Sequence, residues 1–419
     1  MSEARRPARV LVVDAVRGAA VICMIQWHCA DAWVRHPERD GFFFELTRIV
    51  GGFAAPLFLL LAGLSAALVH GPGRSAAGMR RGLGIWVVGY AFKLWAWTVD
   101  YSAILERRNW PAIALDTVAL GLAWLATQEK RSARARLGLG VGAALAWSAM
   151  VFALANATRT PSVVLRLDVL QAIGVCLVLA NALLAAVTRT KHAPLGMLAL
   201  AILVALVTPS FVGLDLGWLP TRVADYVART TADPSLAASG ARFPIFPWLA
   251  YALLGASIGL GVRARPSAGA WDVPFAPSAW VALVLALVVG GLVYEPTPSA
   301  QWLLSHTEQV RNLLRLAWNA SIATAFAALG ALVLSRLPRL ATWMLSLGRH
   351  SLVVYVVHLE IAFGLPCTPI RQTLGFGTWA LGTTALTAAM VALAWGLDLR
   401  EARAKQKARA ATPADAPTR

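Results

Sequence analysis

Long apolar stretches, separated by short basic ones, run along nearly the whole chain. Stretches of roughly 18 or more apolar residues are typical of transmembrane helices, because about 20 residues at ~1.5 Å rise cross the hydrocarbon core. A helix also satisfies its own backbone hydrogen bonds, which lipid cannot do. The pattern therefore predicts an all-α, polytopic transmembrane bundle of about 11–12 spanning helices. We expect spans at residues 11–33, 49–69, 82–100, 111–127, 137–155, 166–187, 194–213, 243–262, 278–294, 312–335, 345–365 and 375–397.

Charge is distributed unevenly over the segments between these spans. Only 14% of the residues are charged and 58% are hydrophobic, yet the net charge is +17. With the N-terminus in the cytoplasm, inner segments hold 22 Lys and Arg residues and outer segments hold 11. This positive-inside bias predicts that the N- and C-termini are cytoplasmic. It also explains the basic composition without a nucleic-acid partner.

The sequence predicts no soluble domain. Residues 1–397 are expected to form a single transmembrane domain, and residues 398–419 a basic cytoplasmic tail that is disordered or lies on anionic lipid. The longest outer loops are expected at residues 34–48 and 214–242. The four cysteines lack metal-ligand spacing, so we interpret them as small buried hydrophobes and expect no metal.

The first predicted helix has four ionisable residues on one side: Asp14, Arg17, His28 and Asp31. At ~100° per residue, Arg17 and His28 share a face and lie about 16 Å apart along the helix axis. Ionisable groups inside a membrane are costly, which makes each a functional candidate. Taken singly, Asp14 with Arg17 is also explained as a structural ion pair, and His28 with Asp31 as an interfacial polar pair. The joint pattern favours function and predicts that this face looks into the bundle.

Later spans hold further polar candidates. Asp168 and Gln171 share a face near the outer end of the sixth span, and His358 lies inside the eleventh. Each alone is more often a structural hydrogen-bond partner than a site residue. Trp248, at the start of the eighth span, is suited equally to packing and to stacking on a sugar ring.

Four stretches of the sequence resemble, in order, the heparan-α-glucosaminide N-acetyltransferase family and its bacterial relatives: Leu11–Met24, Asp168–Gly174, Phe243–Gly259 and Leu347–His358. The Arg17-x10-His28 spacing also resembles that of the broader transmembrane acyltransferase group. In that group an arginine and a histidine so spaced are associated with acyl transfer across the membrane. The resemblance implies a multi-pass protein of the bacterial plasma membrane. It would move an acetyl group from cytoplasmic acetyl-CoA to a sugar or glycan acceptor on the outer side.

The resemblance implies the role of His28, and the chemistry of acyl transfer together with position in the sequence suggests roles for other residues. His28 would be the catalytic histidine, either as a general base or as a nucleophile, and Asp31 would orient its ring. His36, in the loop after the first helix, is the competing assignment and otherwise a substrate-binding residue. The coenzyme A phosphates would lie near Arg17, Asp14, Arg80 and Arg81, although a basic segment such as 74–81 also suits topology or lipid contact. The acceptor would contact Asp168, Gln171, Trp248 and His358.

Two other classes of function fit part of the pattern. A transporter or flippase of a polar or lipid-linked substrate would also need intramembrane charges. A non-catalytic membrane scaffold is a third possibility. The lack of detectable repeat symmetry and the family resemblance favour the enzyme. The acceptor, N- versus O-acylation, the acyl chain length and the formation of a homodimer stay open.

Overall fold

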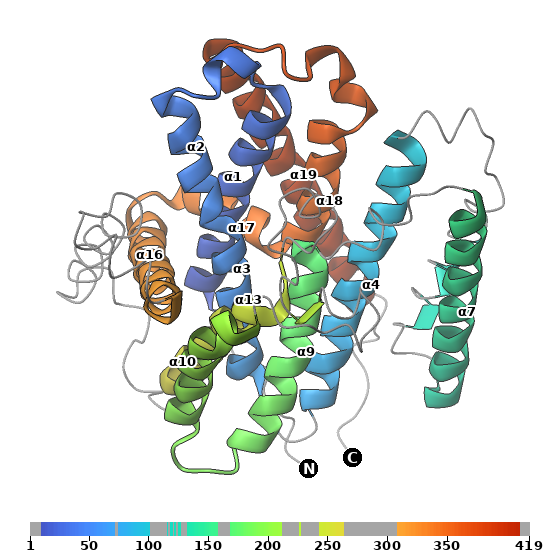
Figure 1. The fold of residues 1–419 in the computed structure, drawn as a ribbon, viewed down its shortest axis with the longest axis vertical. Coiled ribbons are helices and arrows are strands. Elements are labelled where there is room, and N and C mark those ends of the chain that lie inside the picture. The colour runs from blue at the N-terminus through green and yellow to red at the C-terminus, as the bar shows by residue number, and fades with distance from the viewer. Residues whose placement is uncertain are drawn as a thin grey trace. The chain divides into compact units, whose positions relative to one another are not determined.

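The computed structural model describes residues 10–71, 74–100, 132–157, 168–211, 243–263 and 308–410, with residues 226–227 and a few positions between 115 and 126. This part of the chain consists of helices joined by short turns, with one β-bridge between Val34 and Leu374. The described helices, which Figure 1 labels, fall into two compact units by their contacts.

Each unit has its own set of helices. Unit 1 holds α3 (Ala54–Val69), α4 (Arg74–Asp100), α7 (Ala133–Ala157), α9 (Val169–Val187), α10 (Ala193–Phe211), α13 (Ile245–Arg263) and α16 (Glu308–Arg336) up to Ile322. Unit 2 holds α1 (Leu11–Trp33), η1 (His36–Glu38), α2 (Phe42–Gly52), the rest of α16, α17 (Pro338–Arg349), α18 (Ser351–Phe363), η2 (Leu365–Ile370) and α19 (Phe376–Ala410).

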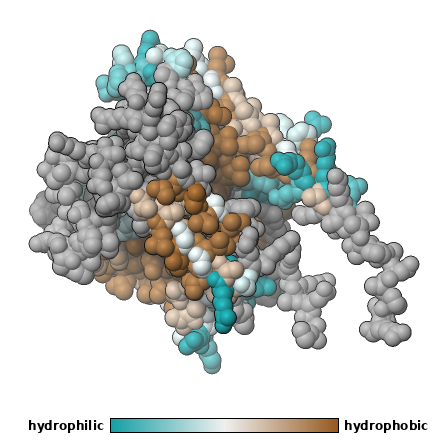
Figure 2. All heavy atoms as spheres, turned by 90° about the vertical axis from the view of Figure 1, so that its right-hand side faces the viewer, coloured by the Kyte–Doolittle hydropathy of each residue, from teal (hydrophilic) through white to brown (hydrophobic). Residues whose placement is uncertain are grey.

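The described helices confirm a polytopic helical membrane protein. Seven are long and apolar enough to cross a membrane, counting α2 with α3 as one span, and the bent pair α17–α18 would be an eighth. On the face in Figure 2, apolar side chains form a broad surface with hydrophilic ones towards its margins. The long helices α4 and α7 match two further predicted spans but are not among the seven. The predicted span 278–294, most of the predicted span 111–127 and nearly all of the loop 214–242 lie outside the described residues.

The predicted eleventh span, 345–365, is wrong as a single helix. The chain bends by 84° between α17 and α18, at His350. α17 begins with Pro338, a residue favoured in the first turn, and is only 12 residues long. One of its faces, including Ala341, Met344 and Leu347, is buried. The apolar pattern of two helices was therefore interpreted as one.

Three predicted non-helical segments are helical. Residues 42–48 of the outer loop begin α2, and residues 74–81 are the first turns of α4. In the predicted tail, residues 399–410 continue α19, because Ala, Arg, Lys, Glu and Gln are strong helix formers. Charge marked where the spans end but not where the helices end. Contact of the tail with lipid stays a prediction.

Close helix crossings in both units depend on glycines. At the four closest of these glycines, an added Cβ would lie 1.8 to 2.1 Å from a backbone carbonyl oxygen of the facing helix. In unit 2 these contacts join α1 to α17, and in unit 1 they join α3 to α13. They pair Gly18 with Met344, Gly348 with Asp14, Gly63 with Ala252 and Gly255 with Leu60. Small residues allow membrane helices to approach closely and gain van der Waals contact.

Candidate active site

α1 and α18 bring two histidines together in unit 2. Nδ1 of His28 lies 2.9 Å from Nε2 of His358. The rings are nearly parallel, at 11°, with centroids 5.2 Å apart. His358 is completely buried at 0% exposure, whereas His28 is partly exposed. A reacting group can therefore reach His28, while His358 lies behind it.

The hydrogen bonds assign the protons of this pair. Nδ1 of His358 lies 2.7 Å from the carbonyl oxygen of Val354, which can only accept. A neutral His358, the form that costs least to bury, donates from Nδ1 and has its lone pair on Nε2. His28 must then donate from Nδ1. In this tautomer the lone pair of His28 is on Nε2, which is the nitrogen that would accept a proton or attack a carbonyl carbon.

Further contacts join α1 to α18 beside the pair. The ring of Phe363 presents its edge to His28, with centroids 5.6 Å apart. The indole N–H of Trp33 donates to the carbonyl oxygen of Ala362 at 3.0 Å. His358 was predicted as an acceptor-binding residue, which stays a prediction, and its contact with the His28 ring also suits it to positioning that ring.

Asp31 contributes its backbone to the end of α1. The carbonyl oxygens of Asp31 and Val34 accept hydrogen bonds from the Arg39 guanidinium at 2.6 and 2.9 Å. Arg39 also lies over the ring of Phe44, 5.4 Å from its centroid. A positive charge beside the last carbonyls stabilises a helix end. Arg39 therefore helps to fix the end of α1, and orientation of His28 by the Asp31 side chain stays a prediction.

His36, the competing histidine, lies on an exposed loop. Its Nε2 donates to Oε1 of Gln372 at 3.0 Å. The same loop is bound to the chain before α19, because the Leu374 N–H donates to the carbonyl oxygen of Trp33 at 2.9 Å. The contacts of His36 are thus those of a loop clamp. The buried pair makes His28 the better organised candidate.

Glu38 adds a charged contact to this clamp. Its carboxylate accepts from the Arg35 guanidinium and, at 2.7 Å, from the N–H of Phe376. The hydrogen bond from Arg35, followed by that from Phe376, lowers the pKa of Glu38 below its usual value. The clamp therefore depends on an ionised Glu38.

At the other end of α1, Asp14 and Arg17 form the predicted ion pair. Nη1 of Arg17 lies 3.0 Å from Oδ1 of Asp14, and their side chains are 17% and 6% exposed. The Asp14 carbonyl faces Gly348 of α17, which brings the helices together here. The pairing is confirmed, and a role in binding coenzyme A stays a prediction.

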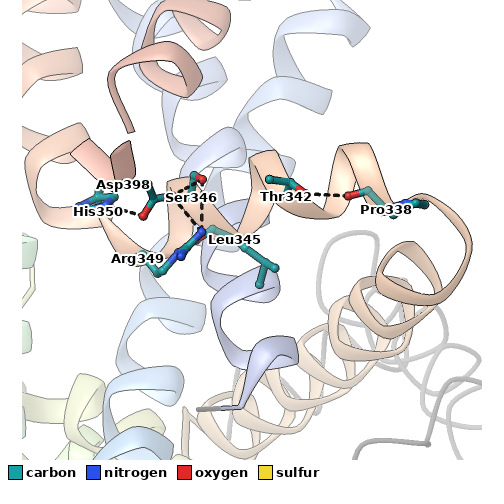
Figure 3. Close-up of polar contacts among 7 residues, drawn as sticks. All are labelled: Pro338, Thr342, Leu345, Ser346, Arg349, His350 and Asp398. Carbon is teal, nitrogen blue, oxygen red and sulfur yellow. Dashed lines mark hydrogen bonds and ion pairs between the residues drawn. The ribbon is translucent and has the colours of Figure 1, made fainter. Parts of the chain in front are cut away.

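The sequence analysis missed a polar cluster at the α17–α18 bend (Figure 3). Asp398 of α19 accepts from Oγ of Ser346 at 2.5 Å and from Nε2 of His350 at 3.0 Å. The same carboxylate pairs with Nη2 of Arg349 at 2.9 Å. One carboxylate thus binds residues of α17 and the residue at the bend. The available signal was an acidic residue at the end of the last apolar stretch.

Two predicted acceptor-binding residues lie together on α9 in unit 1. Asp168 is the N-cap of α9 and accepts from the N–H of Val169 at 2.8 Å. Its Oδ2 is 3.7 Å from Nζ of Lys93 on α4. Gln171 is 1% exposed, and neither polar atom of its side chain has a hydrogen-bond partner.

The remaining predicted site residues of unit 1 are a tryptophan in an aromatic cluster and two exposed arginines. Trp248 packs against Phe243 and Tyr251, with ring centroids 4.8 and 5.7 Å away. These contacts favour packing over stacking on a sugar. Arg80 and Arg81 are exposed on the first turns of α4, where their charges are available to a phosphate or to lipid.

Comparison with protein families decides the class of the protein. An acyltransferase domain family matches residues 10–399, nearly the whole chain. The chain belongs to this acyltransferase family. The match agrees with the broader transmembrane group indicated by the Arg17-x10-His28 spacing, and it does not single out the heparan-α-glucosaminide N-acetyltransferases. A search of curated proteins gives no match.

In a membrane acyltransferase, the histidine pair is a candidate for the acid–base or nucleophilic chemistry of acyl transfer. Acyl transfer needs a base for the incoming nucleophile or a nucleophile that accepts the acyl group first. Nε2 of His28 can do either, while its Nδ1 is held by His358. Among the residues predicted from the sequence, His28 and His358 meet in unit 2, and Asp168 and Gln171 lie together in unit 1.

Proposed function

We propose that this acyltransferase moves an acetyl group from cytoplasmic acetyl-CoA to a sugar or glycan acceptor on the outer side of a bacterial plasma membrane. The observation that supports this most directly is the His28–His358 hydrogen bond, which leaves the lone pair of His28 on Nε2. The resemblance to the heparan-α-glucosaminide N-acetyltransferases supports acetyl as the acyl group. The positive-inside bias supports a cytoplasmic donor side.

In the direct mechanism His28 is a general base. Its Nε2 takes the proton of an acceptor hydroxyl or amine while the acceptor atom bonds to the acetyl carbon. The carbon–sulfur bond then breaks, and the coenzyme A sulfur receives the proton from the His28 imidazolium. His358 stabilises that imidazolium, because its Nε2 accepts the hydrogen bond from Nδ1 of His28 throughout.

In the two-step alternative His28 is a nucleophile. Its Nε2 bonds to the acetyl carbon, coenzyme A leaves as the thiol, and the acceptor later takes the acetyl group from the imidazole. The same tautomer serves both routes. A carrier histidine would also suit a donor and an acceptor that approach from opposite sides of the membrane.

Coenzyme A fits the length of the polar stripe on α1. Arg17 and His28 are eleven residues apart, about 16 Å along the axis, and coenzyme A has its phosphates far from its sulfur. With the thioester at His28, the remainder of the donor would extend towards the Asp14–Arg17 pair. Arg80 and Arg81 are further candidates for phosphate contacts. Membership in an acyltransferase family gives no support to the alternative of a transporter or flippase.

Transfer from labelled acetyl-CoA tests this proposal. Membranes with wild-type protein, His28→Ala, His36→Ala or the control His192→Ala would be incubated with [14C]acetyl-CoA. His192 is an exposed histidine of unit 1. Label on extracted glycans or glycolipids with wild type and His192→Ala, and its loss with His28→Ala, is the expected result. Loss with His36→Ala alone would move the catalytic role to the loop, and no transfer by wild type would overturn the function.

A further inference from the structure

The contact between α4 and α9 in unit 1 includes a polar strip. Residues 86, 89 and 93 of α4 follow one another at helical spacing on one face, as do 168, 171 and 174 of α9. These two faces meet directly. Lys93 pairs with Asp168, and a Cβ added at Gly89 would meet the side chain of Gln171 at 3.0 Å. One added at Gly174 would meet Cβ of Trp86 at 2.8 Å.

Gln171 is the unusual member of this strip. Its side chain is 1% exposed, yet neither the amide nitrogen nor the amide oxygen has a hydrogen-bond partner. A buried, unsatisfied polar group costs roughly 1–3 kcal/mol, and this residue has two. Close packing against Gly89 does not require an amide, because methionine would fill similar space without the cost. The amide therefore needs a partner that the described chain does not supply.

An aromatic and hydroxyl group borders the same face of α4. The indole N–H of Trp86 donates to the hydroxyl of Tyr226 at 3.0 Å, and the hydroxyls of Tyr90 and Tyr226 are hydrogen-bonded to each other. Tyr90 is adjacent to Gly89 and is itself 6% exposed. The strip thus combines aromatic faces, hydroxyls, a neutral amide and an ion pair whose charges cancel.

We infer that this strip binds a neutral hydroxylated ring, the sugar of the acceptor, with Gln171 as the hydrogen-bonding residue. The inference rests on the proposed function for the link between this ring and acyl transfer. A sugar hydroxyl both donates and accepts, so it matches the amide N–H and C=O of Gln171. Lys93 and Asp168 are suited to the adjacent hydroxyls.

Direct binding of simple sugars tests the inference. The full chain would be reconstituted in phosphatidylcholine nanodiscs, because maltoside detergents would present sugars of their own. Methyl glucoside, galactoside, mannoside and N-acetylglucosaminide would be titrated by saturation-transfer NMR against wild type and Gln171→Met. We expect at least one pyranoside to bind wild type, and its Kd to rise about tenfold or more in Gln171→Met.

Asn181→Ala is the matched control. Asn181 is also a buried amide at the α4–α9 contact, about 15 Å along α9 from Gln171, but its Nδ2 donates to the carbonyl oxygen of Leu177 at 2.8 Å. This variant should keep wild-type sugar affinity. Thermal unfolding checks the fold, and Gln171→Met should melt at or above the wild-type temperature because it loses an unsatisfied group.

Each result has a distinct meaning. No binding of any of the four pyranosides, or equal affinity for wild type and Gln171→Met, would overturn the sugar site and leave water as the partner of the amide. The sugar site and the acetyl-transfer function can be rejected independently of each other. Wild type that transfers acetyl groups with a Gln171→Met variant unchanged in acceptor KM would keep the function and reject the site. Sugar binding without any transfer would keep the site and reject the function.

Discussion

His358 in unit 2 and Gln171 in unit 1 are both polar side chains buried almost completely between apolar helices, and they differ in one respect. Both ring nitrogens of His358 are hydrogen-bonded, one to His28 and one to Val354. Neither the amide nitrogen nor the amide oxygen of Gln171 is hydrogen-bonded. A buried polar group with all its hydrogen bonds made is rigid and fixes its neighbour, whereas one without hydrogen bonds can still bind a ligand. The first arrangement suits a residue that positions a reacting side chain, and the second suits a binding site.

Helix packing does not explain this difference. Both units use the same device, glycines that place one helix against a carbonyl of the next, at Gly18 and Gly348 in unit 2 and at Gly63 and Gly255 in unit 1. The crossings are equally close in the two units. What differs is the polar residue that each interface contains.

Removing His358 should have the largest effect. His358→Leu leaves the Nδ1–H of His28 without its acceptor, so the catalytic tautomer is no longer fixed, and kcat should fall about a hundredfold with little change in KM. His358→Gln, whose amide oxygen can accept, should restore part of the rate. Steady-state kinetics with acetyl-CoA measures both.

Two comparisons separate this positioning role from simple destabilisation. Val353→Ala, at an exposed position of α18, should keep the wild-type rate. In a His28→Ala background, His358→Leu should reduce the rate no further, because both changes act on one unit. Additive losses would contradict the positioning role.

Packing at the α1–α17 crossing comes next. Gly18→Ala would force a Cβ against the Met344 carbonyl, and overpacking of this kind costs about 1–3 kcal/mol. Gly330→Ala, where the nearest atoms outside its own helix are 3.6 Å from the added Cβ, should be neutral or more stable by up to about 1 kcal/mol. Thermal unfolding in nanodiscs compares the two, and equal melting temperatures would show that the crossing is looser than described.

Gln171→Met should raise the KM for the acceptor without changing the KM for the acyl donor. We expect the acceptor KM to rise about tenfold, the acetyl-CoA KM to stay constant and the melting temperature to stay level or increase. This combination reverses the usual result of changing a buried residue, which is destabilisation. A fall in stability with unchanged acceptor KM would mean that Gln171 is a packing residue and would remove the contrast with His358.

The smallest effect concerns the outer clamp. The pKa of Glu38 is lowered in the folded chain, so its contribution is present above its unfolded value, near 4.3, and is lost as pH falls through the folded value. Hydrogen exchange of the Phe376 amide, corrected for intrinsic rates, should speed up in that acidic range. The Leu374 amide, bonded to a carbonyl, is the internal control. Glu38→Gln should abolish the pH dependence.

The polar face of α1 could be predicted from the sequence, but the residues that contact it could not. Asp14, Arg17 and His28 could be placed on one face because a single helix fixes their angles and heights. The His28–His358 contact could not be predicted, because it depends on how α18 packs after the 84° bend. That bend lies within an apolar stretch that also fits one span.

Other features depend equally on tertiary contacts. The role of Asp398 follows from α19 meeting the bend, which no local pattern indicates. Asp168 and Gln171 were predicted as neighbours on one helix, correctly, but the unsatisfied state of Gln171 depends on what α4 presents to it. The ring neighbours of Trp248 also come from tertiary packing, and stacking of Trp248 on a sugar stays a prediction.

Sidedness of transfer tests the central claim most directly. Sealed inside-out vesicles with wild type or His28→Ala would receive [14C]acetyl-CoA outside, with a water-soluble glycan extract either enclosed in the lumen or added outside. The account predicts labelled glycan only with wild type and only when the extract is enclosed. Equal labelling from outside, or labelling that survives His28→Ala, would contradict acyl transfer across the membrane through His28.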